Sequence, residues 1–156
     1  CPQLVQAGER LHMGQFSVTT LAVAGSILSG NQHDLSNAGD SLAFNEGRDP
    51  TLARANSDLA VGYYAGTNRV EQPLISPIYG AFDSNFPPFL ITTGTRDLLL
   101  SQAVRLSQRL RDSGVAVDLQ VWEGLWHVFE WYEGLPEARQ SIARIADHLT
   151  RGMAAR

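Results

Sequence analysis

Two residues in the second half of the chain, Asp97 and His127, have side chains that can act as a pair in proton transfer. A carboxylate hydrogen-bonded to an imidazole fixes the tautomer of the ring and stabilises the imidazolium that forms on proton uptake. The other ring nitrogen can then activate a serine hydroxyl as a nucleophile and later protonate the leaving group. A structural interpretation also exists, in which Asp97 caps a helix that begins near Leu98 and His127 is a partly buried loop residue.

Two predicted strands, with a helix between them, would carry this pair. Residues 87–94 form a short, continuous apolar run that closes on glycine, which is typical of an inner parallel strand. Residues 115–122 alternate between apolar and polar types, which predicts a second strand. The segment between them predicts a helix ended by Gly114, because its apolar residues recur at helical spacing: Leu99, Ala103, Leu106 and Leu110.

The chain before these elements predicts one further strand and one further helix. Residues 17–27 are apolar or β-branched and precede a turn-rich segment, which indicates a buried strand. A helix is expected to begin at a cap formed by Asn56 or Ser57, to continue to about Ala65 and to end at Gly66.

The last predicted helix runs from Pro136 to Gly152, whereas residues 1–16 show no interpretable pattern. Strands and helices thus alternate three times, which is typical of an α/β fold with a parallel sheet and right-handed crossovers. In such sheets the chemistry gathers at the carboxyl ends of the strands. Asp97 and His127 both follow strand ends, and neighbouring strands lie only about 4.8 Å apart, so the two side chains are expected to meet.

The stretch from Pro87 to Tyr132 resembles the closing segment of the hormone-sensitive-lipase-like esterases, a bacterial branch of the α/β-hydrolases. Both have a Pro-Pro start, a strand, a glycine followed by an acid, a Leu-rich helix, a second strand and an EG-x-x-H loop. Upstream, the segments AGDSLAFNEGRDP and QPLISPIYG are similar to the family's loop before an Asp-Pro and to its later Ser-Pro segment. The resemblance covers the chain from about Leu21 to the C terminus.

The resemblance implies a fold and a reaction. Residues 1–156 would be a single partial domain, the C-terminal part of a mostly parallel α/β-hydrolase sheet flanked by helices. Asp97 would be the acid and His127 the base of a Ser-His-Asp triad that hydrolyses short-chain esters, and Val128 and Phe129 would line the substrate-binding site. No cofactor is expected, and the histidines and the single cysteine lack the spacing of metal ligands.

The serine of such a triad has no clear counterpart in the chain. The family's elbow reads G-D-S-A-G-G, and the nearest match, residues 39–43, fits only G-x-S-x-A around Ser41. An elbow needs a strand directly before the serine and a helix directly after it, whereas Ser41 lies between turn-rich segments. We therefore expect the nucleophile to lie outside this chain, with Ser41 as a disfavoured alternative.

Two other interpretations were compared with the triad. The letters GDSL also occur in the flavodoxin-like GDSL esterases, but those proteins end on a D-x-x-H motif that this chain lacks. The alternative function that is not enzymatic is that of a non-catalytic hydrolase-like remnant, or an interaction module, that has no nucleophile. The sequence upstream of Cys1 would distinguish them, because an enzyme needs an H-G-G-G loop and a G-D-S-A-G-G elbow there.

Composition argues against several classes of partner. The chain of 156 residues is 44% apolar and 18% charged, as is typical of a globular protein. A net charge of −4 without a basic cluster disfavours nucleic acids and anionic membranes, which select clustered Lys and Arg. Its apolar runs are too short to span a bilayer, and its start shows no leader peptide. The lone Cys1 is typical of a reducing compartment, so a cytoplasmic protein is expected.

The edges of the predicted sheet suggest how the chain associates. Val115–Trp122 would be the last strand, and its unpaired edge could pair with the same strand of a second copy in a homodimer, as the resemblance also suggests. Asp118 on this strand could oppose such pairing. Residues 17–27 would neighbour the missing nucleophile-bearing strand, so without that portion of the fold their apolar edge is an expected aggregation site.

Overall fold

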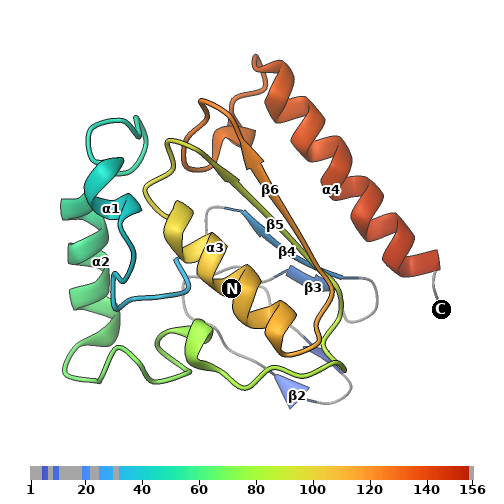
Figure 1. Cartoon of the computed structure of the whole chain (residues 1–156), viewed down its shortest axis with the longest axis horizontal. Coiled ribbons are helices and arrows are strands. Elements are labelled where there is room, and N and C mark those ends of the chain that lie inside the picture. Colours follow the sequence, from blue (N-terminus) through green and yellow to red (C-terminus); the bar gives the residue numbers. More distant parts are fainter. Residues whose placement is uncertain (1–4, 7–8, 11–18, 22–24, 30–31, 155–156) are drawn as a thin grey trace.

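A four-stranded sheet organises the chain in the computed structural model, which describes residues 5–6, 9–10, 19–21, 25–29 and 32–154 (Figure 1). Its strand order is β3-β4-β5-β6, with bounds Thr19–Leu21, Gly25–Ser29, Phe89–Gly94 and Val117–Trp122. β4, β5 and β6 are parallel, and β3 is antiparallel to β4. β1 (Val5–Gln6) and β2 (Glu9–Arg10) form a separate antiparallel pair.

Helices cover both faces of this sheet. α3 (Leu100–Asp112) packs on the face that contains Phe89 and Ile91, and Ala103, Leu106 and Leu110 complete this core. Successive side chains of a strand point to opposite faces, so Thr92 faces the other way, toward α4 (Pro136–Ala154). In Figure 1, α3 lies in front of the sheet and α4 lies beside it.

The α/β fold and its mostly parallel sheet are confirmed, and three predicted elements agree closely with the structure. β5, α3 and β6 occupy the segments expected for strand, helix and strand. Gly114 ends α3 with a φ of +81°, a left-handed conformation that glycine adopts without steric cost. α4 begins at Pro136 as expected and continues two residues beyond Gly152.

The single strand predicted over residues 17–27 is wrong, because this stretch contributes to two antiparallel strands. Leu21 at the end of β3 pairs with Gly25 at the start of β4; residues 17–18 and 22–24 lie outside the described residues. A continuous apolar run has no periodicity that would locate a reversal of the chain. As a consequence β4 has a partner on each side, and β3, which comes from the same stretch, is the edge strand of the described sheet. Aggregation along this edge stays a prediction.

The segment between β4 and β5 holds α1 (Ser41–Phe44), α2 (Arg54–Ala65) and a 3-10 turn η1 (Pro77–Tyr79). Gly66 ends α2 as predicted, with a φ of +56°. The predicted cap at Asn56 or Ser57 is wrong, because the helix begins at Arg54. The backbone N–H of Arg54 is instead satisfied by the Glu46 carboxylate at 2.9 Å, a contact that local sequence does not reveal.

Buried polar contacts attach this segment to α3. The Gln102 side chain accepts hydrogen bonds from the backbone N–H groups of His33 and Asp34, both at 3.1 Å. The Asp34 carboxylate is fully buried and pairs with the Arg105 guanidinium. Partial burial alone would lower the pKa of Arg105, but hydrogen bonds to Asp34 and Tyr79 raise it above its ordinary value. The loop entering α1 is therefore anchored to α3 by a charged pair.

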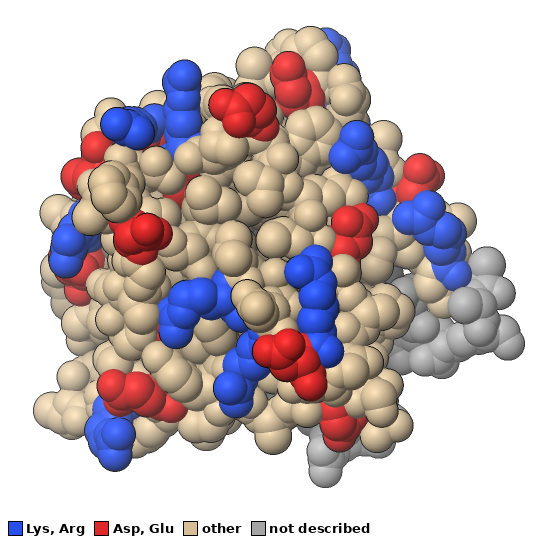
Figure 2. Space-filling model, viewed as in Figure 1, with Lys and Arg blue, Asp and Glu red and all other residues tan. Residues whose placement is uncertain are grey.

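The face of the molecule shown in Figure 2 has few features that identify a partner. Acidic and basic side chains are interspersed there, with uncharged residues between them. Among the described residues, no helix has the length and apolar character needed to cross a membrane.

Candidate active site

Asp97 lies in the turn that leads from β5 into α3, and its side chain is only 4% exposed. Its Oδ2 accepts a hydrogen bond from the Thr93 hydroxyl at 2.8 Å, and its Oδ1 accepts one from the backbone N–H of Leu99 at 2.8 Å. One donor on each oxygen therefore fixes the orientation of the carboxylate. The bond to Leu99 agrees in part with the capping interpretation, although α3 itself begins one residue later, at Leu100.

His127 lies in the loop after β6, and its Nδ1 is 3.3 Å from Oδ1 of Asp97. The predicted acid and base are therefore in contact at the carboxyl ends of two neighbouring parallel strands. The distance is longer than a strong charge-assisted hydrogen bond, as is common for catalytic pairs without a bound substrate. None of the hydrogen bonds among the described residues uses Nε2 of His127, so this nitrogen can serve a reacting group.

The loops that carry the acid and the base are joined directly to each other. The N–H groups of Thr95 and Arg96 donate to the carbonyls of Trp122 and Leu125 at 2.9 and 2.8 Å. The Thr95 hydroxyl accepts the N–H of Gly124 at 2.8 Å. These three hydrogen bonds extend the pairing of β5 and β6 beyond the strands, so the loops are expected to move as one unit.

Gly94 permits the close approach of these loops. A Cβ atom at this position would overlap the carbonyl group of Leu125 and approach the backbone nitrogen of Trp126 at 2.8 Å. Both obstructing groups belong to the main chain, so they cannot rotate away as a side chain could. Only glycine allows the histidine loop to lie on the end of β5.

We therefore expect Gly94→Ala to lower the free energy of unfolding of the complete protein by roughly 1–3 kcal/mol, because the histidine loop must move outward. Gly62→Ala is the matched control: nothing lies within 4 Å of a Cβ at Gly62, and alanine is favoured over glycine inside a helix such as α2. Urea unfolding measures both variants. An unchanged free energy of unfolding in Gly94→Ala would contradict the close packing described here.

The chain beyond His127 is held in a strained conformation. Val128 has φ 50° and ψ 36°, the left-handed region that β-branched residues rarely adopt, at a cost of about 1–3 kcal/mol. The next turn, η2 (Phe129–Trp131), is anchored by Glu130, whose Oε1 accepts the hydroxyls of Thr92 and Ser141 at 2.7 and 2.9 Å. Glu130 thus joins β5 and α4 to the histidine loop, a contact that the sequence did not predict.

The two residues expected to line the site differ in their surroundings. Val128 is half-buried next to the histidine, whereas Phe129 is fully buried. Phe129 packs with Leu125 and Ala138, and its ring centroid is 5.7 Å from that of Trp122. Among the described residues, Phe129 therefore packs into the core and stabilises the histidine loop. Contact of either residue with a substrate stays a prediction.

Ser41, the alternative nucleophile, has its hydroxyl engaged in structural contacts. It is buried, donates to the carbonyl of Leu98 at 2.8 Å and accepts the N–H of Ser101 at 2.9 Å. The residues directly before it, 32–40, form turns and bends with no strand. Ser41 therefore has neither the setting of an elbow nor a free hydroxyl, and it attaches α1 to the start of α3.

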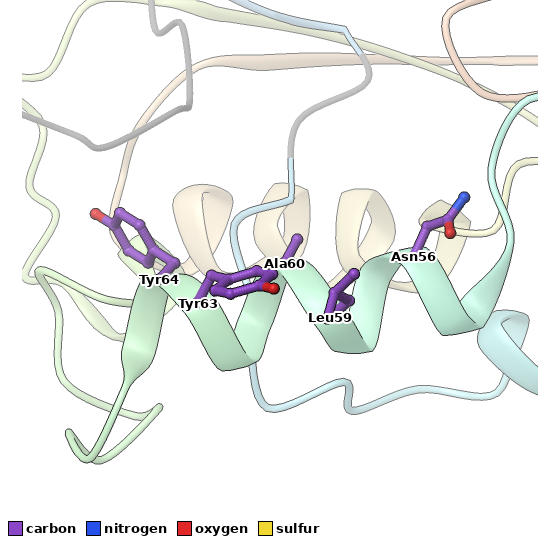
Figure 3. A pocket seen from close by; sticks show the side chains of 5 residues that line it. All are labelled: Asn56, Leu59, Ala60, Tyr63 and Tyr64. Carbon is purple, nitrogen blue, oxygen red and sulfur yellow. The ribbon is translucent and has the colours of Figure 1, made fainter.

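A shallow recess lies on the surface of α2, and neither the acid nor the base lines it (Figure 3). All of its lining residues come from this one helix: Asn56, Leu59, Ala60, Tyr63 and Tyr64. Leu59 and Tyr63 are 58% and 82% exposed, so the recess is a gap between side chains on an open helix surface. Its polar side chains, Asn56, Tyr63 and Tyr64, all lie on this one helix, and we assign the recess no role in the chemistry.

Comparison with known sequences gives two clear relatives and one family. Residues 9–131 match a family model described as the alpha/beta hydrolase fold. An esterase of Acinetobacter venetianus is 29% identical over 133 residues, which are 83% of this chain and 43% of that protein. An acetyl-hydrolase of Streptomyces hygroscopicus is 36% identical over 85 residues, 54% of this chain and 28% of that protein.

Comparison with solved structures also finds similar esterases and lipases. An esterase from the bacterial hormone-sensitive lipase family superposes with a TM-score of 0.76 at 30% identity, over 83% of this chain and 43% of that one. A hormone-sensitive lipase from a metagenome library gives 0.77 at 28% identity, over 82% and 44%. The chain thus spans less than half the length of each of these relatives.

Proposed function

Because this chain belongs to the α/β-hydrolase family, as the match over residues 9–131 shows, we propose that it is the acid- and base-bearing part of a serine carboxylic ester hydrolase. The observation that supports this proposal most strongly is the contact between Asp97 and His127 at adjacent strand ends. The relatives named esterase and acetyl-hydrolase support ester hydrolysis as the reaction.

The proposed chemistry uses the two ring nitrogens of His127 for different tasks. Nε2 takes the proton of a serine hydroxyl while the serine oxygen attacks the ester carbonyl carbon, and it then delivers this proton to the departing alcohol. Nδ1 keeps its proton directed at Asp97, whose charge stabilises the imidazolium. A water molecule, activated by Nε2 in the same way, releases the acid from the serine. Val128, beside the histidine, is proposed to border the substrate.

The nucleophile is proposed to come from a portion of the protein outside this chain. The engaged hydroxyl of Ser41 and the relatives' greater length both support this proposal. The same observations suit the rival function, a non-catalytic module without a nucleophile. The acid and the base favour the enzyme, because a module without a reaction has no need of a buried carboxylate in contact with a partly exposed imidazole.

An assay of the complete protein tests the proposed function. We expect hydrolysis of p-nitrophenyl acetate and butyrate, with kcat/KM falling as the acyl chain lengthens toward laurate. Residues 1–156 alone are expected to show no turnover above the buffer rate, because they would lack the attacking serine and the oxyanion donors. Turnover by residues 1–156 that Ser41→Ala abolishes would instead make Ser41 the nucleophile, and inactivity of the complete protein would favour the rival module.

We also propose that the complete protein is a homodimer joined along β6, the last strand of the described sheet. Leu119 packs against the core beneath α3, so a proline there would disturb the core. Val121 is 46% exposed, so it can be replaced without disturbing the core. Val121→Lys is expected to convert a dimer into a monomer, because an edge lysine opposes strand pairing. Light scattering measures this, and a wild-type monomer at micromolar concentration would contradict the dimer.

A further inference from the structure

The loop between α1 and α2 contains a buried carboxylate that the proposed reaction does not use. Asp49 is only 7% exposed, and no ion pair among the described residues includes it. A buried charge of this kind is costly unless several hydrogen bonds satisfy it. The donors that satisfy Asp49 therefore indicate what it does.

Three of the donors come from its own loop and fix the orientation of the carboxylate. Oδ1 of Asp49 accepts the N–H and the hydroxyl of Thr51 at 2.9 and 2.8 Å, and the N–H of Leu52 at 3.0 Å. Pro50 between them restricts the backbone further, because its ring fixes φ. Oδ1 thus holds the carboxylate in one position, and the other oxygen is left to point away from the loop.

Oδ2 of Asp49 joins the two halves of the catalytic pair. It accepts the N–H of Leu98, the residue directly after Asp97, at 3.0 Å, and the N–H of His127 at 3.2 Å. One oxygen atom therefore sets the separation between the backbone of the acid turn and the backbone of the base. These contacts are 49 and 78 positions apart along the chain.

The same loop also holds the other side of His127. The Thr51 hydroxyl is 2.9 Å from the carbonyl oxygen of His127 and shares its proton between this carbonyl and Asp49. Both peptide groups that flank the histidine are thus bound to residues 49–51, directly before the left-handed Val128. With the backbone fixed at both ends, only rotation of the ring is left to His127.

We propose that Asp49 is a positioning residue that holds His127 against Asp97, an inference that rests on the proposed hydrolase function. Asp49 does not touch the reacting atoms. It acts through the backbone of the two residues that do, and a carboxylate is needed because all five donors require an acceptor. In Asp49→Asn an NH₂ group replaces one of the two oxygens and faces N–H donors, so the hydrogen bonds that this oxygen accepts are lost.

Kinetics of the complete protein test this proposal. Asp49→Asn is expected to lower kcat by about 10²-fold and to change KM by less than about threefold, since a misplaced catalytic group slows the chemical step while the substrate still binds. In a His127→Ala background, Asp49→Asn is expected to lower the residual rate no further, because the group that it positions is already absent. A general structural role would lower both rates by the same factor.

Asp34→Asn is the matched control, because Asp34 is also a buried carboxylate but contacts α3 rather than the pair. It is expected to lower the melting temperature and leave kcat of the folded protein unchanged. If Asp49→Asn does not fold, Thr51→Val replaces it, with an expected loss in kcat of about tenfold from the released His127 carbonyl.

The outcomes separate this proposal from the proposed function. If His127→Ala is inactive and Asp49→Asn keeps a kcat within twofold of wild type, the positioning role is overturned. Where Asp49→Asn does not fold, the same kcat in Thr51→Val overturns it. Equal losses from Asp49→Asn with and without His127 also overturn it. Full activity in His127→Ala would contradict the catalytic role of Asp97 and His127, and with it the positioning role of Asp49.

Discussion

Replacing Asp97 by asparagine is expected to lower the kcat of the complete protein by about 10⁴-fold while the fold stays intact. The side chain keeps its shape, so its oxygen can still accept the N–H of Leu99, which is 2.8 Å from Oδ1 in the wild type. The Thr93 hydroxyl, 2.8 Å from Oδ2, can rotate and accept from the new NH₂ group. The negative charge that stabilises the imidazolium is lost whichever way the amide is oriented.

Activity and stability therefore separate in this variant, which distinguishes the triad from the helix-capping interpretation. A cap needs only an oxygen, and asparagine serves nearly as well as aspartate, so the melting temperature should change little. Asp118→Asn on β6 is the control, because Asp118 is exposed and its side chain hydrogen-bonds only to Gln120 among the described residues. A kcat of Asp97→Asn within tenfold of wild type would leave Asp97 as a structural residue.

The sequence allowed the central part of the fold and the candidate pair to be predicted for a physical reason. β5, α3 and β6 follow one another along the chain, and each has its own local signal: an apolar run closed by Gly94, a helical period ended by Gly114, and an alternating pattern. Once two consecutive strands are parallel, the residues after their carboxyl ends must lie close together. The meeting of Asp97 and His127 thus follows from local patterns alone.

The contacts that support the pair could not be predicted in this way. In the sequence Asp49 was recognisable only as part of the Asp-Pro that follows a family-like loop, because its distant partners are backbone N–H groups, which every residue but proline possesses. Glu130 was hidden for the same reason, since Thr92 and Ser141 have no pattern that links them. The reversal between β3 and β4 was missed because an apolar run has no turn signal.

These missed contacts all fix loops rather than strands or helices. The sheet brings the acid and the base within reach, but the 3.3 Å between Asp97 and His127 depends on where two loops hold their backbones. Gly94, Asp49 and Glu130 each hold the histidine loop through a different contact. Variants at these positions should therefore affect the chemistry through geometry, whereas variants of the pair remove the chemical groups themselves.

His127→Ala is the variant that removes the base, and we expect it to lower kcat by about 10³-fold or more with little change in KM. The loop should stay in place, because both of its bonds to residues 49–51 use the backbone N–H and carbonyl of this residue, which alanine retains. The side chain is 14% exposed, so its removal opens a cavity that solvent can reach. Imidazole added to the solution can enter this cavity and is expected to restore part of the rate.

The control is His148→Ala, because His148 is a half-buried histidine on α4 whose ring, among the described residues, hydrogen-bonds only to the carbonyl of Pro88, at 3.3 Å. Its kcat should equal that of the wild type. A loss in kcat in both histidine variants would indicate a general loss of structure, and an unchanged kcat in His127→Ala would exclude His127 as the base. A loss confined to His127→Ala, with partial rescue by imidazole, would instead require an imidazole at this position, because no other change in the loop would be repaired by the free ring.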